Sequence, residues 1–158
     1  MNGTLPIAFL LLLTQASSVA LAKPKTVFEA LEGFKGKWNI QAGGKSLPIE
    51  MTYDEGSKDS IVTEQFGKEL SVFYRDGKNI LMTHFCNAGN QPRLKLNDSN
   101  EPGKFEFVTF DVTNLKNADD PHVRRIIYRV RNEKQIELEL VWKKGKSEES
   151  EKYVLSKK

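Results

Sequence analysis

The stretch Ile136-Glu137-Leu138-Glu139-Leu140 alternates apolar and acidic residues without interruption. Side chains of a β-strand point alternately to its two faces, so this stretch predicts a strand with one face in a core and the other in water. The same period of two recurs along most of the chain. Its apolar positions are Trp38, Ile40 and Ala42; Ile49, Met51 and Tyr53; Ile61 and Thr63; Leu70, Val72 and Tyr74; Ile80 and Met82; Leu94 and Leu96; Phe105 and Phe107; Ile126, Tyr128 and Val130; Trp142; and Tyr153 and Leu155.

Turn-forming residues separate these strands, for example at Gly43-Gly44 and Asp76-Gly77. Intervals of about 8 to 12 residues between such turns are typical of antiparallel barrels and sandwiches. Residues 26–34 precede the strands and have apolar residues at helical spacing, and an irregular insert follows much later at residues 114–121. We therefore expect an all-β fold, an antiparallel up-and-down β-barrel of about ten strands with one short N-terminal helix.

The length, charge and cysteine content of the chain limit the folds and functions that we expect. Its 158 residues, 39% of them hydrophobic, suit one domain rather than two. The 24 Lys and Arg residues nearly balance the 21 Asp and Glu residues, and they form no basic cluster of the kind that binds nucleic acid, so nucleic acid is not an expected partner. One cysteine can form no internal disulfide and is no basis for a structural zinc site. Apolar burial and backbone pairing must therefore stabilise the fold.

The N-terminal segment has the features of an export signal. An apolar run from Leu5 to Leu13 is followed by small residues that end in Ala20-Leu21-Ala22, the pattern of a signal peptidase site. The run is shorter than the roughly 20 apolar residues that span a bilayer. We expect a signal peptide over residues 1–22 and a single mature domain over residues 23–158. That domain is expected in the periplasm or outside the cell, with no membrane contact after cleavage; a retained anchor is the alternative.

The start of the strand region resembles a known group of proteins. The element Gly36-Lys37-Trp38, which follows a short helix in an exported chain, resembles the opening of the calycin barrels: lipocalins, fatty-acid-binding proteins and nitrobindin-like barrels. The resemblance implies that Trp38 packs across the closed end of a barrel that holds one small ligand. The lipocalin disulfides are absent here, and no haem-ligating histidine can be placed. The segment 82–93 also resembles a segment of exported bacterial proteins of unassigned function.

The first candidate site begins at His84. The apolar face of Ile80 and Met82 continues into His84 and Cys86 before the chain turns. If Ile80 and Met82 line a cavity, His84 and Cys86 lie at its rim, about 7 Å apart along the strand. The polar head group of a ligand could bind there. Alternatively, His84 is a hydrogen-bonded residue of the core or rim, and Cys86 is a small buried hydrophobic residue.

A second group of candidates lies on a later strand, where His122 and Arg124 share a face with Tyr128. If the two strand ends meet, a basic mouth suited to a carboxylate or phosphate forms from His84, Arg93, His122 and Arg124. The ligand-binding candidates are therefore His84, Cys86, Arg93, His122, Arg124 and Tyr128. Alternatively, the arginines of this strand form ordinary cross-strand ion pairs with a neighbouring strand. The residues concerned are Arg124, Arg125, Arg129 and Arg131, with Glu137 and Glu139 as partners.

Two chemical alternatives involve the same residues. His84, Cys86 and His122, with Asp119 or Asp120, are suitable metal ligands by type, but His-x-Cys on a strand is not a recognised zinc spacing. Catalysis by Cys86 would need a base within hydrogen-bond reach, and His122 from a neighbouring strand could supply one. We name no catalytic residue, no metal ligand and no cofactor.

The sequence thus predicts an exported β-barrel that holds a small, largely apolar or amphipathic ligand, with polar contacts at its mouth and no catalytic step. Trp38 and Trp142 are expected to be structural, packed in the core or across the barrel end. Two alternatives stay open. One is a structural or interaction protein whose barrel is filled, and the other is a haem, metal or thiol enzyme site around His84, Cys86 and His122. The ligand's identity and the oligomeric state do not follow from the sequence.

Overall fold

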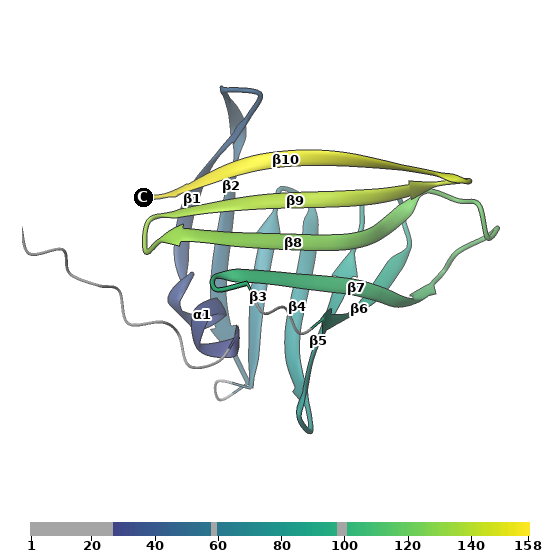
Figure 1. Cartoon of the computed structure of the whole chain (residues 1–158), viewed down its shortest axis with the longest axis horizontal. Helices are drawn as coiled ribbons and strands as arrows, with labels where there is room; N and C mark the ends of the chain where they lie inside the picture. The colour runs from purple at the N-terminus through teal and green to yellow at the C-terminus, as the bar shows by residue number, and fades with distance from the viewer. Residues whose placement is uncertain (1–26, 58–59, 98–100) are drawn as a thin grey trace, which may run out of the picture.

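The computed structural model of the chain describes residues 27–57, 60–97 and 101–158, and in these residues it has one helix and ten strands. The fold is the expected antiparallel β-barrel with one short N-terminal helix (Figure 1). The elements are α1 (Val27–Gly33), β1 (Gly36–Ala42), β2 (Lys45–Gly56), β3 (Ile61–Phe66), β4 (Glu69–Asp76), β5 (Asn79–Phe85), β6 (Gln91–Asn97), β7 (Lys104–Thr113), β8 (His122–Asn132), β9 (Gln135–Lys144) and β10 (Ser147–Lys157).

The barrel closes because β1 pairs with both β2 and β10, while every other strand pairs with its neighbours in the sequence. Short hairpins make this order possible. In the hairpin between β4 and β5, Asp76 is paired with Asn79, and Gly77 has a φ of +58°, a conformation that favours glycine. Such a tight turn fixes which residues of β4 and β5 lie opposite each other, and this register determines the composition of the site described below.

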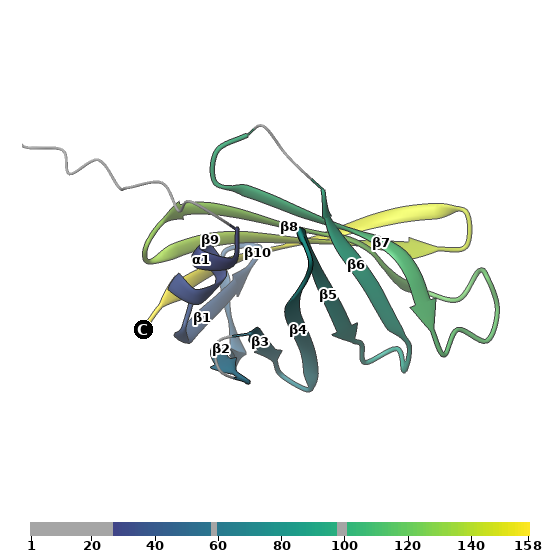
Figure 2. The same cartoon turned by 90° about the horizontal axis from the view of Figure 1, so that it is seen from below.

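Helix α1 covers the end of the barrel at which β4 turns into β5 (Figures 1 and 2). Phe28 and Leu31 of α1 are fully buried, and the guanidinium of Arg75, beside that hairpin, lies 4.3 Å from the centre of the Phe28 ring. Trp38 is also fully buried, and its Nε1 donates a hydrogen bond of 2.7 Å to the Phe34 carbonyl. Trp38 therefore lies in the core near the helix, as expected. We call the opposite end, where β3 turns into β4, the far end.

Aromatic rings from facing walls meet inside the barrel. Phe73 on β4 packs edge-on against Phe107 on β7 and Tyr128 on β8, with ring centres 5.5 and 6.1 Å apart. All three side chains are completely or almost completely buried. A barrel of this strand number has room for side chains or for one small ligand. Here the rings occupy the interior at the level of Phe73, so free space for a ligand must lie elsewhere.

The inward faces of β3 and β4 differ from the sequence prediction. The residues expected on the apolar faces were Ile61 and Thr63 on β3, and Leu70, Val72 and Tyr74 on β4. The structure instead buries Val62 and Glu64 on β3, and Glu69, Ser71 and Phe73 on β4. Apolar residues stand on both faces of these strands, so alternation alone does not choose between them; burial of the large Phe73 ring is compatible with only one choice.

A bulge in β8 changes the face expected for its first residues. Opposite β9, the register shifts between Val123 and Arg125, which leaves Arg124 as the extra residue. Val123 is fully buried as a result, and His122 and Arg124 no longer share the regular inner face that Tyr128 occupies. The pattern of apolar and polar residues along this part of the sequence does not predict the bulge.

The irregular insert at residues 114–121 is a loop without a helix. Its Asp120 carboxylate accepts hydrogen bonds from the backbone amides of Lys116 and Asn117 at 3.1 and 2.9 Å.

The expected signal peptide, residues 1–22, lies outside the described residues. Within the part of the chain that the structure describes, no helix has the length and apolar character needed to cross a membrane.

Candidate functional site

A row of polar side chains crosses the inner wall of four neighbouring strands. Tyr53 on β2 is paired with Glu64 on β3, Glu64 with Ser71 on β4, and Ser71 with His84 on β5. All four residues are buried. We call Tyr53, Glu64, Ser71 and His84 the polar row. The polar row runs from Tyr53, whose ring packs 5.5 Å from the Phe34 ring just after α1, to His84, which on β5 is two residues further from α1 than Met82.

Hydrogen bonds connect the polar row to the opposite wall. Ser71 Oγ donates to Glu64 at 3.1 Å, and the Tyr128 hydroxyl on β8 donates to the other oxygen of the same carboxylate at 2.7 Å. Ser71 Oγ also lies 3.0 Å from His84 Nδ1. With Glu64 ionised, the single Ser71 hydroxyl proton goes to that carboxylate, so the His84 Nδ1–H donates to Ser71. The lone pair of His84 then resides on Nε2.

His84 Nε2 is buried and has no hydrogen-bond partner among the described residues. The same holds for three other side-chain atoms of these residues: Tyr53 Oη, Asn90 Oδ1 and Trp142 Nε1. The Tyr53 hydroxyl lies close to the Glu64 carboxylate and favours its ionised form, so His84 Nε2 is the atom of the polar row with no partner nearby. Buried polar groups in native proteins are nearly always paired, so an unpaired one such as His84 Nε2 calls for a partner such as a water molecule, an ion or a ligand.

Burial sets the protonation of these groups. It lowers the pKa of His84 to about 4, which leaves the imidazole neutral at neutral pH. Burial also raises the pKa of the Glu64 carboxyl, although the hydrogen bonds from the Tyr128 and Ser71 hydroxyls favour its ionised form. A neutral imidazole with an unpaired lone pair can accept a hydrogen bond or coordinate a metal ion.

Glu69 and Cys86 lie next to His84. One oxygen, nitrogen or sulfur atom from each of these three residues is within 4.8 Å of the other two, and all three residues are buried. We call Glu69, His84 and Cys86 the His84 site. The Cys86 thiol donates to Glu69 at 3.7 Å, and the Asn87 amide donates to the same carboxylate oxygen at 3.1 Å. Burial raises the pKa of the Cys86 thiol to about 11, so this cysteine is not an activated nucleophile.

Two aromatic rings flank the His84 site at the far end. Phe66 on β3 is paired with Glu69, and it packs edge-on against Tyr153 of β10 with ring centres 5.4 Å apart. Both rings are only partly buried, in contrast to the rings near Phe73. The site thus combines buried polar atoms with partly exposed aromatic surface.

The structure gathers only part of the expected ligand-binding set. His84 and Cys86 lie together, and Tyr128 reaches them through Glu64 and Ser71. Arg93 does not join them, because it is exposed on the outer face of β6 and forms an ion pair with Asp111.

His122 and Arg124 are held by backbone carbonyls at the start of β8. His122 Nδ1 is 2.8 Å from the Asp120 carbonyl oxygen, and Arg124 Nη1 donates to the Thr109 carbonyl at 2.7 Å. With Arg93 on the outer face, the four residues expected to form a basic mouth do not converge. The physical reasons are the β8 bulge and the outward face of Arg93.

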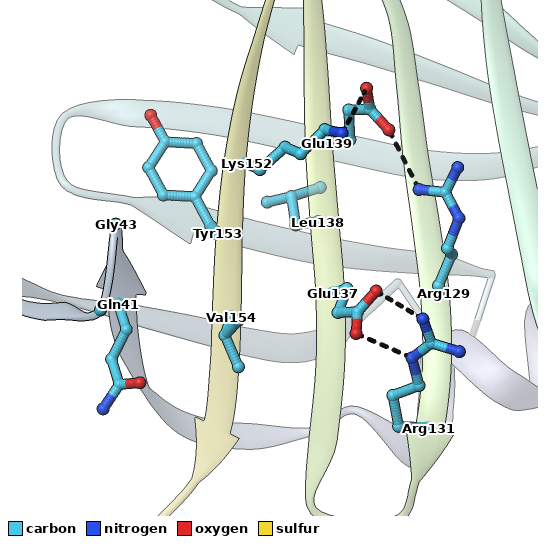
Figure 3. Close-up of a pocket in the computed structure, with 11 residues that line it drawn as sticks. Gln41, Gly43, Arg129, Arg131, Glu137, Leu138, Glu139, Lys152, Tyr153 and Val154 are labelled. Carbon is cyan, nitrogen blue, oxygen red and sulfur yellow. Dashed lines mark hydrogen bonds and ion pairs between the residues drawn. The ribbon is translucent and has the colours of Figure 1, made fainter.

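A surface groove of about 400 Å³ lies between the β1–β2 hairpin and the strands β8, β9 and β10, and the Tyr153 ring is part of its lining (Figure 3). The charged residues that line it are paired with each other. Arg129 bonds Glu139 at 3.0 Å, and Arg131 bonds Glu137 at 2.7 Å, so the cross-strand pairs expected for these two arginines are confirmed. Arg125 pairs instead with Glu106 and Glu148. Because the groove's charges neutralise one another, it is a weaker candidate than the His84 site.

The sequence reasoning missed Glu64, Ser71 and Glu69. A usable signal existed in the tight hairpin at Gly77, which pairs Asp76 with Asn79. Counting away from that pair, towards lower numbers on β4 and higher numbers on β5, places Ser71 opposite His84 and Glu69 opposite Cys86. The wrong choice of inward face on β3 and β4 concealed this signal, because it placed all three residues on the outside.

Comparison with known proteins gives no family assignment. No protein-family model matches the chain, and no curated protein matches it. The fold is consistent with a calycin-like barrel, while membership of that group has no support from these comparisons. The functional conclusion therefore depends on the site itself.

Proposed function

We propose that the protein is an exported binding protein that holds one small amphipathic ligand at the far end of its barrel, without a catalytic step. The supporting observation is the buried, unpartnered Nε2 of His84. An unsatisfied buried polar atom costs about 1–3 kcal/mol, and a bound ligand atom would offset that cost. Export is proposed from the signal-peptide pattern of residues 1–22, which also favours the periplasm or the extracellular space.

The site favours a particular ligand chemistry. The ligand must present an electron-pair acceptor to His84 Nε2, either an N–H or O–H donor or a metal ion. Any apolar part of it would pack on the partly exposed rings of Phe66 and Tyr153. Because aromatic rings fill the interior around Phe73, the ligand is smaller than the long-chain lipids that a fully hollow barrel holds.

The alternative of an interaction protein with a filled barrel has one observation in its favour, the packed rings around Phe73. Such a protein would display a contiguous apolar patch for its partner. The large exposed hydrophobic residues of the described chain are Phe85 and Phe110, and the Arg93 guanidinium lies 5.4 Å from the Phe110 ring centre. Two separate rings, one of them under an arginine, do not make such a patch.

Binding can be tested on protein recovered from its native host. We expect native mass spectrometry to show a bound mass of one small ligand per chain, or saturable binding of the amphipathic probe 1-anilinonaphthalene-8-sulfonate. The variant His84→Gln should lose the bound mass or the probe, while His122→Gln, which removes the other histidine, should retain it. Equal binding by wild type and His84→Gln, or no binding by either, would contradict the proposed function.

A further inference from the structure

We propose that the His84 site binds one borderline-soft divalent metal ion of the Zn²⁺ class, coordinated by Glu69, His84 and Cys86. This inference rests on the proposed function, because the metal ion would be the group through which the same site holds its small ligand. The three residues come from the start of β4, the end of β5 and the residue after β5, and strand pairing brings them together. None of them is more than 8% exposed.

Two independent observations indicate a metal rather than an ordinary buried cluster. First, one donor atom from each residue lies within 4.8 Å of the others. Second, His84 Nε2 is buried without a partner, whereas its Nδ1 is held by Ser71. Metal-ligating histidines commonly donate their second ring N–H to an oxygen, which fixes the tautomer and the ring orientation. Ser71, itself bonded to Glu64, supplies that oxygen here.

The donor types select the metal. Imidazole nitrogen and thiolate sulfur favour Zn²⁺ and other late first-row ions over Mg²⁺ and Ca²⁺, which prefer oxygen ligands. Bond lengths of about 2.0–2.3 Å place the ligand atoms of a tetrahedral zinc site about 3.3–3.8 Å apart. Cys86 Sγ and Glu69 Oε1 are already 3.7 Å apart. The largest separation in the site, at most 4.8 Å, would close by about 1 Å through side-chain rotation.

The metal would replace the thiol proton that now lies between Cys86 and Glu69. Cys86 would bind as the thiolate, and its proton would pass to solvent. The Ala88 amide, whose nitrogen is 3.3 Å from Sγ, remains to stabilise the sulfur's negative charge. Three protein ligands leave a fourth position of a tetrahedral ion open for water or for a small ligand.

Titration of the purified, chelator-treated protein with Zn²⁺ or Co²⁺ tests the site. We expect one ion per chain by calorimetry and elemental analysis, with a thiolate-to-metal charge-transfer band in the Co²⁺ spectrum, and no comparable binding of Mg²⁺. His84→Gln, Cys86→Ser and Glu69→Gln should each weaken binding by more than about 100-fold, and Ser71→Ala by about 10- to 100-fold, the range for an outer-shell partner. His122→Gln should leave the affinity unchanged.

Near-ultraviolet circular dichroism of each variant separates loss of a ligand from loss of the fold, and the near-isosteric Cys86→Ser keeps the test usable if His84→Gln is unstable. No stoichiometric binding, or binding that survives in both Cys86→Ser and His84→Gln, would overturn the metal site. If no metal binds while an organic mass or the fluorescent probe still depends on His84, only the metal assignment fails. If neither metal nor organic ligand depends on His84, the proposed function fails as well.

Discussion

The variant Phe73→Ala should lower the free energy of unfolding by about 3–5 kcal/mol, as expected for removal of a large buried ring that leaves a cavity. Phe73 has no exposed surface and packs between Phe107 and Tyr128, which come from the facing wall. The loss has two parts, the transfer of the ring to water in the unfolded chain and the contacts that its neighbours forfeit. Denaturant unfolding followed by tryptophan fluorescence measures it.

Phe110 provides the matched control. Its side chain is 55% exposed, and the Arg93 guanidinium lies 5.4 Å from its ring centre. We expect Phe110→Ala to change the free energy of unfolding by no more than about 1 kcal/mol, the usual value of an exposed cation–π contact. A Phe73→Ala variant as stable as Phe110→Ala would mean that the interior around Phe73 is hollow rather than filled.

Acid should destabilise the metal-free protein through His84. Burial lowers the folded-state pKa of His84 to about 4, whereas an unfolded chain has a histidine pKa of about 6.5. Above pH 6.5, both states are neutral and the full stability is present. As the pH falls from 6.5 towards 4, only the unfolded state gains the proton, and the folded state loses about 3 kcal/mol relative to it.

The comparison that isolates this effect uses His84→Gln, which retains hydrogen-bonding groups but does not titrate. Unfolding free energies are measured with a chelator present at pH 7.5 and pH 4.5. Wild type should lose about 2–3 kcal/mol more than the variant between these two values. Other titrating groups, including the surface carboxylates of Glu50 and Glu137 whose pKa is lowered by lysine and arginine partners, are common to both proteins. A difference that stays constant with pH would show that His84 is not buried in its neutral form.

Much of the fold follows from local sequence rules. The alternation from Ile136 to Leu140, together with glycine turns at regular spacing, predicts short antiparallel strands, and the number of strands predicts a barrel. These rules work because each strand buries one face and each hairpin fixes its own register. They fail where both faces carry apolar residues, as on β4, and where a bulge shifts the alternation, as at Arg124.

The sequence predicts some residues of the candidate site and not others. His84 and Cys86 are visible in the sequence, because polar residues continue an apolar face at the end of a strand. Glu69 and Glu64 are not visible in this way, because acidic residues on a short strand are ordinarily assigned to its wet face. Tyr128 was found on its strand, but its contact with Glu64 crosses the barrel between residues 64 positions apart, and no local pattern encodes that contact.

The central claim is that His84 presents an unprotonated Nε2 to an incoming ligand. Nitrogen-15 NMR of the histidine rings tests it most directly, because protonated and unprotonated ring nitrogens have clearly different chemical shifts. At neutral pH, with metal removed, we predict that His84 carries its proton on Nδ1 and that its Nε2 signal changes when ligand or Zn²⁺ is added. A proton on Nε2, or an Nε2 signal that no ligand or metal ion alters, would contradict this account.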